Sequence, residues 1–539
     1  MKAGLAALFF CTIVSCLLQS GRSAAAPDMR CRMLASQIIP GLAIRHSEML
    51  AAGTMMPMEF SAPAKVAGPV CRLAGTISTR PGQSIGLEVW MPVHWNQRFE
   101  GVGSGGFGGS ISYGELVAAT AQGFAAASTD TGHQGAAFAK EGEKLAWAAH
   151  AVTLDDWGRN AVHLMTVAAR QVVAAYYGKA PLHAYFNGCS TGGAEAMSEA
   201  EFFPADYDGI QAGSPGMAYS RLIQSFIWTA MPSRRDPLAA LPDAALALLH
   251  DAVLHACAGA KAVPSDRFLT EPETCRFDPN TLACRPGQPA QECLSRPQVD
   301  AARHIYAPVV DARTGTEIYP GYARGGEADP DHSPGKFSVT GWYMNQGILA
   351  GAVSSPLLAN TIMPEPAWKW ASFDFDKDSD RIARLLSPRI DAMNPDLRMF
   401  AARGGRLIMT QGWNDAFNAP TLPIEYWKKL SGLMGNPDRF MRLYMVPGMG
   451  HCGGGPGPNL FGGSGQPAGP ASDADHDVVA SLVRWVEENK APDMLIATRY
   501  GSDAAHGKTE MQRPLCGYPR HVAYRGSGDP LKADSFMCR

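Results

Sequence analysis

The sequence is marked first by what it lacks. Its 539 residues carry 47 basic and 50 acidic side chains with no Lys/Arg-rich run, which argues against nucleic acid as a partner. Beyond the N-terminus, no uncharged apolar segment is long enough to span a membrane. No C-x-x-C pair occurs, so the clustered ligands of a zinc site are missing. These absences leave a globular protein with a sizeable core, built as one large domain with an insertion or as two domains.

The N-terminus has the pattern of an export signal. A lysine precedes an apolar run from Leu5 to Leu18, and the small residues Ala24 to Ala26 offer a cleavage site. We therefore predict that residues 1–26 are a signal peptide and that the protein is secreted or periplasmic. Lipoprotein processing at Cys16 is a second interpretation, but the A-x-A-like site is better placed.

The cysteines indicate an oxidising compartment. Two of the twelve leave with the signal peptide, and an even number in an exported protein indicates disulfides. The sequence leaves their connectivity open, although four cysteines between positions 257 and 293 suggest local bridges. The ten that remain are Cys31, Cys71, Cys189, Cys257, Cys275, Cys284, Cys293, Cys452, Cys516 and Cys538.

Strand and helix patterns alternate along the first part of the mature chain. Alternating apolar residues at 85–89 and the buried runs at 123–130, 183–187 and 209–212 predict strands, and helices are predicted at 154–177 and from Gly192 onward. The alternation resumes with predicted strands at 406–412 and 439–448 and a helix at 475–490. This order predicts an α/β fold with a mostly parallel sheet.

The alternation is interrupted between about Pro215 and Pro395. This stretch is irregular, rich in Pro, Gly, Cys and Trp, and contains one clear amphipathic helix, around Ala244 to His255. We predict a sheet domain in two parts, 27–215 and 396–539, with residues 216–395 inserted as a lid.

The segment G-C-S-T-G places Ser190 between a predicted strand and a predicted helix. A strand, a tight turn of small residues and a helix form the nucleophile elbow of serine hydrolases, which lifts the hydroxyl above the sheet edge. The alternative is a plain glycine turn. Such a serine needs a base and a group that orients the base. Asp415 follows one downstream strand and His451 follows the next, so the order Ser190, Asp415, His451 is that of an α/β-hydrolase.

Other side chains compete for these roles. His133, His150 and His183 lie upstream of the serine and are better explained as surface or structural groups. Asp438 is a rival to Asp415 but precedes its strand, and an ordinary loop carboxylate is the alternative for Asp415 itself.

The cysteines beside the serine and the histidine suggest a bridge between the two loops. Cys189 directly precedes Ser190 and Cys452 directly follows His451, so a Cys189–Cys452 disulfide would tie the nucleophile turn to the base loop. A free thiol next to a nucleophile would be a liability, so Cys189 needs a partner. The pairing with Cys452 is a hypothesis.

The glycine-rich segment GVGSGGFGG supports two interpretations. Its glycines allow a close backbone approach, so Gly105 or Gly106, together with the N–H group of Thr191, could bind an oxyanion. The spacing Gly101-x-Gly103-x-x-Gly106, with Asp130 after a later strand, also matches a dinucleotide fingerprint. The export signal and the roughly eighty mature residues before this segment argue against an oxidoreductase.

The chain also resembles the tannase and feruloyl esterase family, which includes mono(2-hydroxyethyl) terephthalate hydrolase. The landmarks are VWMPVHWNQRFEGVGSGGFGG, STDTGH, FNGCSTGG, FPADYDGIQAGSP, DLRMFAARGGRLIMTQGWND and VPGMGHCGGG, which extend over nearly all the mature chain. The resemblance implies an α/β-hydrolase core, a lid that contacts substrate, and the roles of nucleophile, base and orienting acid for Ser190, His451 and Asp415. It implies the disulfides Cys189–Cys452, Cys31–Cys71, Cys257–Cys275, Cys284–Cys293 and Cys516–Cys538.

Two positions depart from the family pattern. An aspartate-rich calcium loop usually follows the first lid cysteine, but this chain has Ala258 and Lys261 near the carboxylate positions and only Asp266 as a survivor. Calcium takes about 6 to 8 oxygen ligands, so we predict no metal and no cofactor. Ala194 stands where an arginine is common, which weakens the match beside the elbow.

The function predicted from these patterns is the hydrolysis of small aromatic acid esters, such as feruloyl, galloyl or terephthalate esters. A binding protein of the same fold without activity is the alternative from another class. Several aromatic side chains of the insertion could line an acyl pocket, although core packing is the better explanation for any one of them: Trp228, Trp342, Tyr343, Trp368 and Trp370. The sequence does not predict the oligomeric state.

Overall fold

The structure is a computed structural model that describes residues 27–58, 62–139, 145–259, 263–331, 338–363, 368–466, 472–501 and 508–539. The predicted signal peptide, residues 1–26, and Lys261 lie outside the described residues. No helix in the described ranges is long and apolar enough to cross a membrane.

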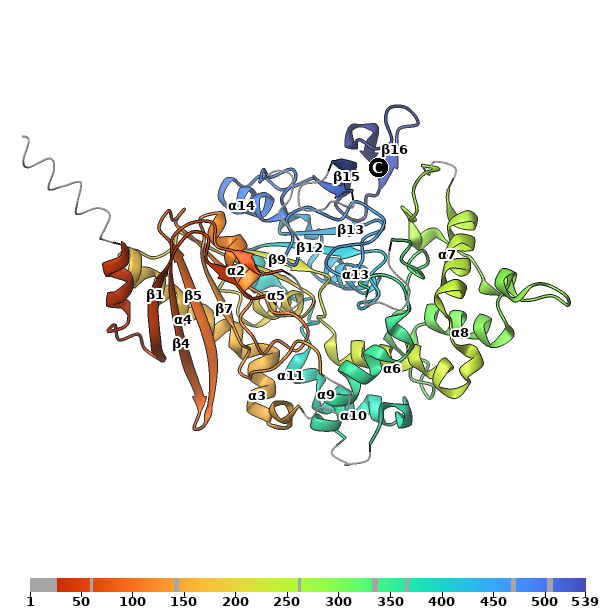
Figure 1. Cartoon of the computed structure of the whole chain (residues 1–539), viewed down its shortest axis with the longest axis horizontal. Coiled ribbons are helices and arrows are strands. Elements are labelled where there is room, and N and C mark those ends of the chain that lie inside the picture. Colours follow the sequence, from red (N-terminus) through yellow and green to blue (C-terminus); the bar gives the residue numbers. More distant parts are fainter. Residues whose placement is uncertain are drawn as a thin grey trace, which may run out of the picture.

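A nine-stranded sheet forms the centre of the molecule (Figure 1). Its spatial order is β1-β4-β5-β7-β6-β8-β9-β12-β13, antiparallel from β1 to β7 and parallel from β7 to β13. The strands are β1 (Leu42–Leu50), β4 (Val70–Arg80), β5 (Gln83–Pro92), β6 (Arg98–Val102), β7 (Ala125–Thr129), β8 (His183–Cys189), β9 (Gly209–Gly213), β12 (Arg406–Gly412) and β13 (Met441–Val446). The predicted α/β fold with a mostly parallel sheet is therefore confirmed.

Helices cover both faces of this sheet. One face packs on α4 (Ala161–Tyr177), α5 (Thr191–Phe202) and α13 (Leu422–Met434), and the other on α2 (Tyr113–Ala121) and α14 (Val478–Glu488). Strands β7 and β9 are buried along their whole length, as expected of parallel strands covered on two sides. The helix predicted over 154–177 is α3 (Ala151–Asp155), a π-helical turn and α4, and it ends at Gly178 with a φ of 74°.

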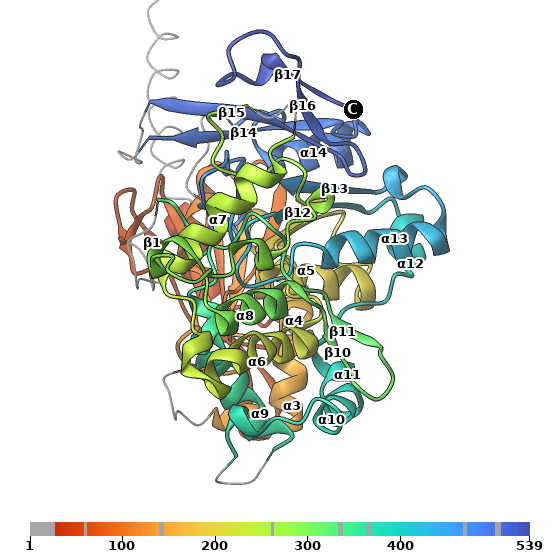
Figure 2. The same ribbon diagram turned by 90° about the vertical axis from the view of Figure 1, so that its right-hand side faces the viewer.

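The chain leaves the sheet after β9 and returns to it at β12, which pairs directly with β9. The amphipathic helix predicted around Ala244 to His255 is present as α7 (Asp243–Cys257), but the segment also contains helices that the sequence did not reveal. The segment contains α6 (Tyr219–Arg235), α7 (Asp243–Cys257), α8 (Arg296–Tyr306), α9 (Ser355–Thr361), α10 (Asp378–Leu385), α11 (Ser387–Ile390) and, just before β12, α12 (Arg398–Ala402), with the small hairpin β10 (Val309–Val310) and β11 (Glu317–Tyr319). Figure 2 shows α7 and α8 in front of the sheet.

Helix α6 was not predicted from the sequence, although its apolar residues recur with helical spacing: Leu222, Ile223, Phe226, Ile227, Ala230 and Met231. Its polar residues Gln224, Ser225 and Thr229 are buried as well, and no side-chain cap marks its first turn. Pro232 lies inside its last turn and has the appearance of a helix breaker in the sequence.

Short hairpins complete the fold. β2 (Met55–Met56) pairs with β3 (Ala64–Lys65), and after α14 come β14 (Met494–Tyr500) with β15 (Thr509–Cys516) and β16 (Val522–Tyr524) with β17 (Phe536–Cys538). In Figure 2 these C-terminal hairpins lie beside α7. The described residues contain five disulfides: Cys31–Cys71, Cys189–Cys452, Cys257–Cys275, Cys284–Cys293 and Cys516–Cys538.

Candidate active site

Ser190 occupies a strained turn between β8 and α5. Its φ of 64° and ψ of −118° lie outside the regions that residues with a side chain prefer, and the turn holds this geometry because its neighbours are small. A Cβ atom added to Gly188 would collide with the carbonyl oxygen of Gly192. The crowded glycines thus let the strand turn sharply into the helix and leave the serine side chain at the carboxyl end of β8.

The structure brings Ser190 together with His451 and Asp415. The Ser190 Oγ atom lies 2.7 Å from His451 Nε2, and His451 Nδ1 lies 2.9 Å from Asp415 Oδ2. Asp415 follows β12 and His451 follows β13, so the three groups come from the carboxyl ends of β8, β12 and β13 in the parallel half of the sheet.

Several donors fix the carboxylate of Asp415, which is 2 % exposed. The backbone N–H groups of Phe417 and Asn418 donate to Oδ1 at 2.8 and 2.9 Å, and Gln411 Nε2 donates to Oδ2 at 2.9 Å. With His451 added, both oxygens have defined partners, which orients the carboxylate toward the imidazole. Gln411 was not predicted from the sequence, because a buried amide in a strand looks like any other core residue.

The inserted segment also supports the histidine. The carbonyl oxygen of Val339 accepts hydrogen bonds from the N–H groups of His451, at 2.9 Å, and Ala416, at 3.4 Å. The ring of Phe417 stacks on the imidazole with centroids 4.7 Å apart. The loops that carry Asp415 and His451 are therefore joined through a residue of the inserted segment, a contact that no sequence pattern predicts.

The Cys189–Cys452 disulfide joins the residue before Ser190 to the residue after His451. The Cα atoms of the two cysteines are 5.9 Å apart, although 263 positions separate them in the chain. Cys452 has a φ of 65°, and its N–H group donates to Ser214 Oγ at 3.3 Å. The bond thus joins the His451 loop directly to the last residue of β8, next to Ser190.

The glycine-rich segment lies beside α5. Thr191 is the first residue of that helix, so its N–H group has no partner within the helix. Its Oγ1 donates to the carbonyl oxygen of Gly106 at 2.5 Å, which places the glycine turn next to the serine. Among the described residues, the N–H groups of Gly105 and Gly106 have no hydrogen-bond acceptor. Three backbone donors are therefore left over close to Ser190.

A dinucleotide site does not match this geometry. The glycine run continues into a turn, and α2 begins only at Tyr113, so no helix N-terminus directly follows β6. The Asp130 carboxylate already accepts hydrogen bonds from the N–H groups of Gly86 and Gly132, at 2.8 and 2.9 Å.

Comparison with known proteins decides the family. The family model described as "Tannase and feruloyl esterase" matches residues 71–539. An uncharacterized esterase of Xanthomonas campestris is 34 % identical to the chain, over 87 % of this chain and 84 % of the relative. The chain belongs to the tannase and feruloyl esterase family. It is a carboxylic ester hydrolase of that family.

A further relative and a solved structure are similar to this esterase over most of its length. The mono(2-hydroxyethyl) terephthalate hydrolase of Piscinibacter sakaiensis is 31 % identical, over 87 % of this esterase and 84 % of the relative. The crystal structure of feruloyl esterase B from Aspergillus oryzae superposes with a TM-score of 0.84 at 22 % identity, covering 95 % of this chain and all of the other. At that identity, the superposition establishes the shared fold.

The competing histidines and the rival carboxylate lie elsewhere in the esterase. His133 stacks on Trp147 with centroids 4.1 Å apart, and burial lowers its pKa to about 4. His150 is exposed before α3, and His183 begins β8, 3.8 Å from Asp208. Asp438 lies 3.6 Å from Arg442, at the opposite end of β13 from His451.

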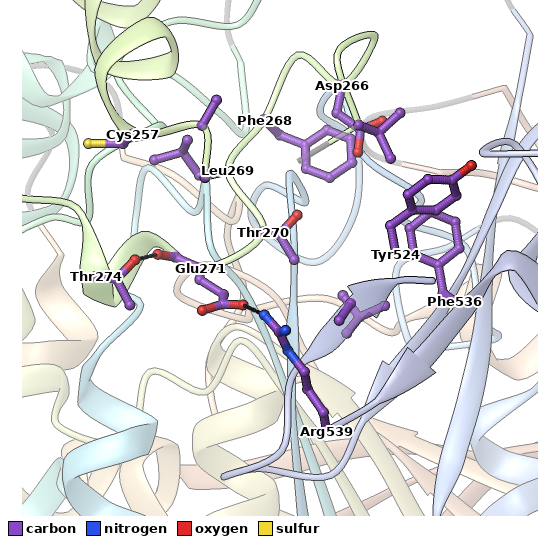
Figure 3. A pocket seen from close by; sticks show the side chains of 15 residues that line it. Cys257, Asp266, Phe268, Leu269, Thr270, Glu271, Thr274, Tyr524, Phe536 and Arg539 are labelled. Carbon is purple, nitrogen blue, oxygen red and sulfur yellow. Dashed lines mark hydrogen bonds and ion pairs between the residues drawn. The ribbon is translucent and has the colours of Figure 1, made fainter. Parts of the chain in front are cut away.

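The loop after Cys257, where the family pattern has a calcium site, holds an ion pair in this esterase. Asp266 Oδ1 lies 2.9 Å from Arg513 Nη2, and both side chains are almost fully buried. Figure 3 shows the adjacent pocket of about 200 Å³, in which Glu271 faces Arg539. Both acidic side chains of this pocket thus have cationic partners, and Ala258 supplies no ligand. The described residues of the loop therefore do not fit a calcium ion.

The aromatic residues of the insertion are engaged in packing. Trp342 is 1 % exposed and meets Tyr306 edge to face, and Trp228 stacks on His304 with centroids 4.0 Å apart. Tyr343, Trp368 and Trp370 are half-buried against the main core. Ala194, at the departure from the family pattern, lies in the first turn of α5.

Proposed function

We propose that this esterase is an exported serine hydrolase that cleaves esters of aromatic acids. The observation that carries the proposal is the unbroken chain of contacts from Ser190 Oγ to His451 Nε2 and from His451 Nδ1 to the Asp415 carboxylate. This arrangement allows a neutral imidazole to remove the serine proton while the carboxylate stabilises the imidazolium that forms.

The reaction has two halves. Ser190 Oγ attacks the ester carbonyl carbon as its proton moves to His451 Nε2, and the oxyanion accepts hydrogen bonds from the N–H groups of Thr191 and of Gly105 or Gly106. His451 then donates the proton to the leaving alcohol, which leaves an acyl group on Ser190. In the second half, His451 removes a proton from water, the hydroxide attacks the acyl carbon, and the acid departs as Ser190 regains its proton.

The substrate class rests on the relatives. Their names specify feruloyl esterase and mono(2-hydroxyethyl) terephthalate hydrolase activities, and both kinds of substrate are esters of a flat aromatic acid. We extend this class to the present chain, with feruloyl, galloyl and terephthalate monoesters as candidates. The insertion at residues 216–395 serves as the lid that contacts the ring.

Export is supported by two features. The pattern of residues 1–26 is that of a signal peptide, and the five disulfides require an oxidising compartment to form and persist.

A panel of esters tests the substrate class. Methyl ferulate, methyl gallate, a hydroxyethyl terephthalate monoester and methyl hexanoate are compared by kcat/KM, with and without chelator. We expect at least one aromatic ester to exceed the aliphatic ester by about a hundredfold, since ring burial contributes roughly 2 to 3 kcal/mol. Equal rates for all four esters would contradict the proposed substrate class.

A further inference from the structure

The buried carboxylate of Glu195 lies one helical turn after the proposed nucleophile and is not used in the mechanism above. It belongs to α5, is 7 % exposed, and points at the glycine-rich segment instead of at His451. The N–H group of Ser104 donates to Glu195 Oε2 at 2.9 Å, and Ser104 Oγ bonds Oε1 at 2.5 Å. A charged group buried at this position calls for an explanation, because burial of a carboxylate is costly.

Ser104 is held entirely by α5. Besides the two bonds to Glu195, its carbonyl oxygen accepts a hydrogen bond from the N–H group of Gly192 at 2.8 Å. The peptide bond is planar, so fixing the Ser104 carbonyl also fixes the direction of the N–H group of Gly105. The same helix therefore carries the N–H group of Thr191 and sets the geometry of the facing glycine turn.

Gly103, at the start of the glycine turn, packs closely against α5. A Cβ atom on Gly103 would lie 2.6 Å from the Cα atom of Gly192 and 3.3 Å from Glu195 Oε2. The glycines permit this close approach but supply no rigidity, because glycine is the most flexible residue of the backbone. The rigidity of the turn must come from its partners, and Glu195 supplies two of the three bonds to Ser104.

We propose that Glu195 is a positioning residue for ester hydrolysis: acting through Ser104, it holds the glycine turn at 105–106 in register with Thr191, so that the two backbone donors meet one oxyanion. The inference rests on the proposed serine mechanism. It identifies the residue that holds the backbone donors of the oxyanion site in place. Burial raises the pKa of Glu195 to about 7, which agrees with a carboxyl group enclosed by the helix and the loop.

The test compares truncation with a conservative replacement. Glu195→Ala removes both acceptors and should lower kcat by about tenfold to a hundredfold with little change in KM, because displaced oxyanion donors act on the transition state. Glu195→Gln keeps the shape, an acceptor for the Ser104 N–H group and a partner for its hydroxyl, and should retain kcat within about threefold. Ser104→Ala removes one bond only and should give an intermediate loss.

Glu199→Ala is the matched control, since Glu199 is buried in the next turn of the same helix and makes no hydrogen bond to the glycine turn within the described residues. It should leave kcat unchanged. Equal losses in the Glu195→Ala and Glu199→Ala variants, or no rescue by glutamine, would overturn the proposal. If Glu195→Ala fails to fold, the kcat of Ser104→Ala is compared with that of the wild type instead. A lower kcat supports the proposal, and an unchanged kcat overturns it.

Failure of the serine mechanism would give a different result from failure of this inference. Without the mechanism, the wild-type protein itself would not react with a fluorophosphonate at Ser190. With the mechanism but without the positioning role, the wild type and Glu195→Ala would react at the same rate.

Discussion

Removal of the Cys189–Cys452 disulfide should reduce both stability and turnover. The perturbation is the double variant Cys189→Ala/Cys452→Ala, which avoids an unpaired thiol beside Ser190. In the chain-entropy treatment, a bridge across 263 positions contributes about 5 to 6 kcal/mol to the free energy of unfolding. The two disulfides Cys257–Cys275 and Cys284–Cys293, which lie inside this loop, span 18 and 9 positions, and the logarithmic dependence makes their effect on that figure negligible.

The Cys516–Cys538 bridge provides a matched control, because it spans 22 positions within the C-terminal hairpins. The same treatment gives about 3 to 4 kcal/mol for its removal. Both double variants should therefore unfold at lower temperature, the active-site variant more so.

The two variants should differ most in turnover. His451 would keep its bond to Val339 and its stacking on Phe417 but lose the covalent link to the serine turn. Since a displacement of about 1 Å can cost a hundredfold in rate, we expect kcat at 25 °C to fall by about tenfold to a hundredfold in the Cys189/Cys452 variant and to stay near wild type in the control. Thermal unfolding and initial rates on an activated ester measure both effects. Unchanged kcat in a folded Cys189/Cys452 variant would refute the claim that the bridge preorganises the site.

Three further predictions concern buried polar groups. Gln411→Leu should lower kcat about tenfold, because a hydrogen bond to the charged Asp415 is lost, as measured by steady-state kinetics. Burial raises the pKa of Glu100 from 4.5 to about 8. Between these two pH values the folded state keeps a proton that the unfolded state releases, so the free energy of unfolding falls as the pH rises across this range. The stability gain of Glu100→Gln over wild type should therefore grow from about pH 5 to about pH 9, as measured by thermal unfolding. A chelator should change neither the melting temperature nor the activity. Arg513→Gln should destabilise the fold by about 3 to 5 kcal/mol, because the Asp266 carboxylate is left buried without its cationic partner.

Each of these predictions has a control. Gln211→Leu removes a buried amide from the neighbouring strand β9 that bonds Thr410 and not Asp415, and an equal loss of kcat there would contradict the role of Gln411. A pH-independent difference between Glu100→Gln and wild type would contradict the raised pKa. Asp266→Asn should restore part of the stability lost in Arg513→Gln, and calcium-dependent melting of the wild type would show that a metal binds.

Local patterns predicted the parts of the fold where one physical preference dominates. The strand at 406–412 was predicted at its observed bounds, because a run of apolar side chains between a Gly-Gly pair and a glycine has few other solutions. Helix α6 was missed although its apolar residues have helical spacing, because no capping side chain marks its start and Pro232 lies inside it.

Contacts between distant segments were beyond local reasoning. Cys189 and Cys452 could be paired because each stands beside a chemically distinctive residue, but the bond from His451 to the Val339 carbonyl involves backbone atoms that every residue has. Glu195 and Ser104 lie 91 positions apart and look like ordinary helix and loop residues until the fold brings them together.

The central claim is that Ser190 is a nucleophile activated by His451. Mass spectrometry of the intact protein treated with a fluorophosphonate, followed by peptide mapping, tests it most directly. We predict one adduct per chain, located on Ser190, absent in Ser190→Ala and strongly slowed in His451→Ala. An adduct on another residue, or equal labelling of wild type and Ser190→Ala, would contradict the account.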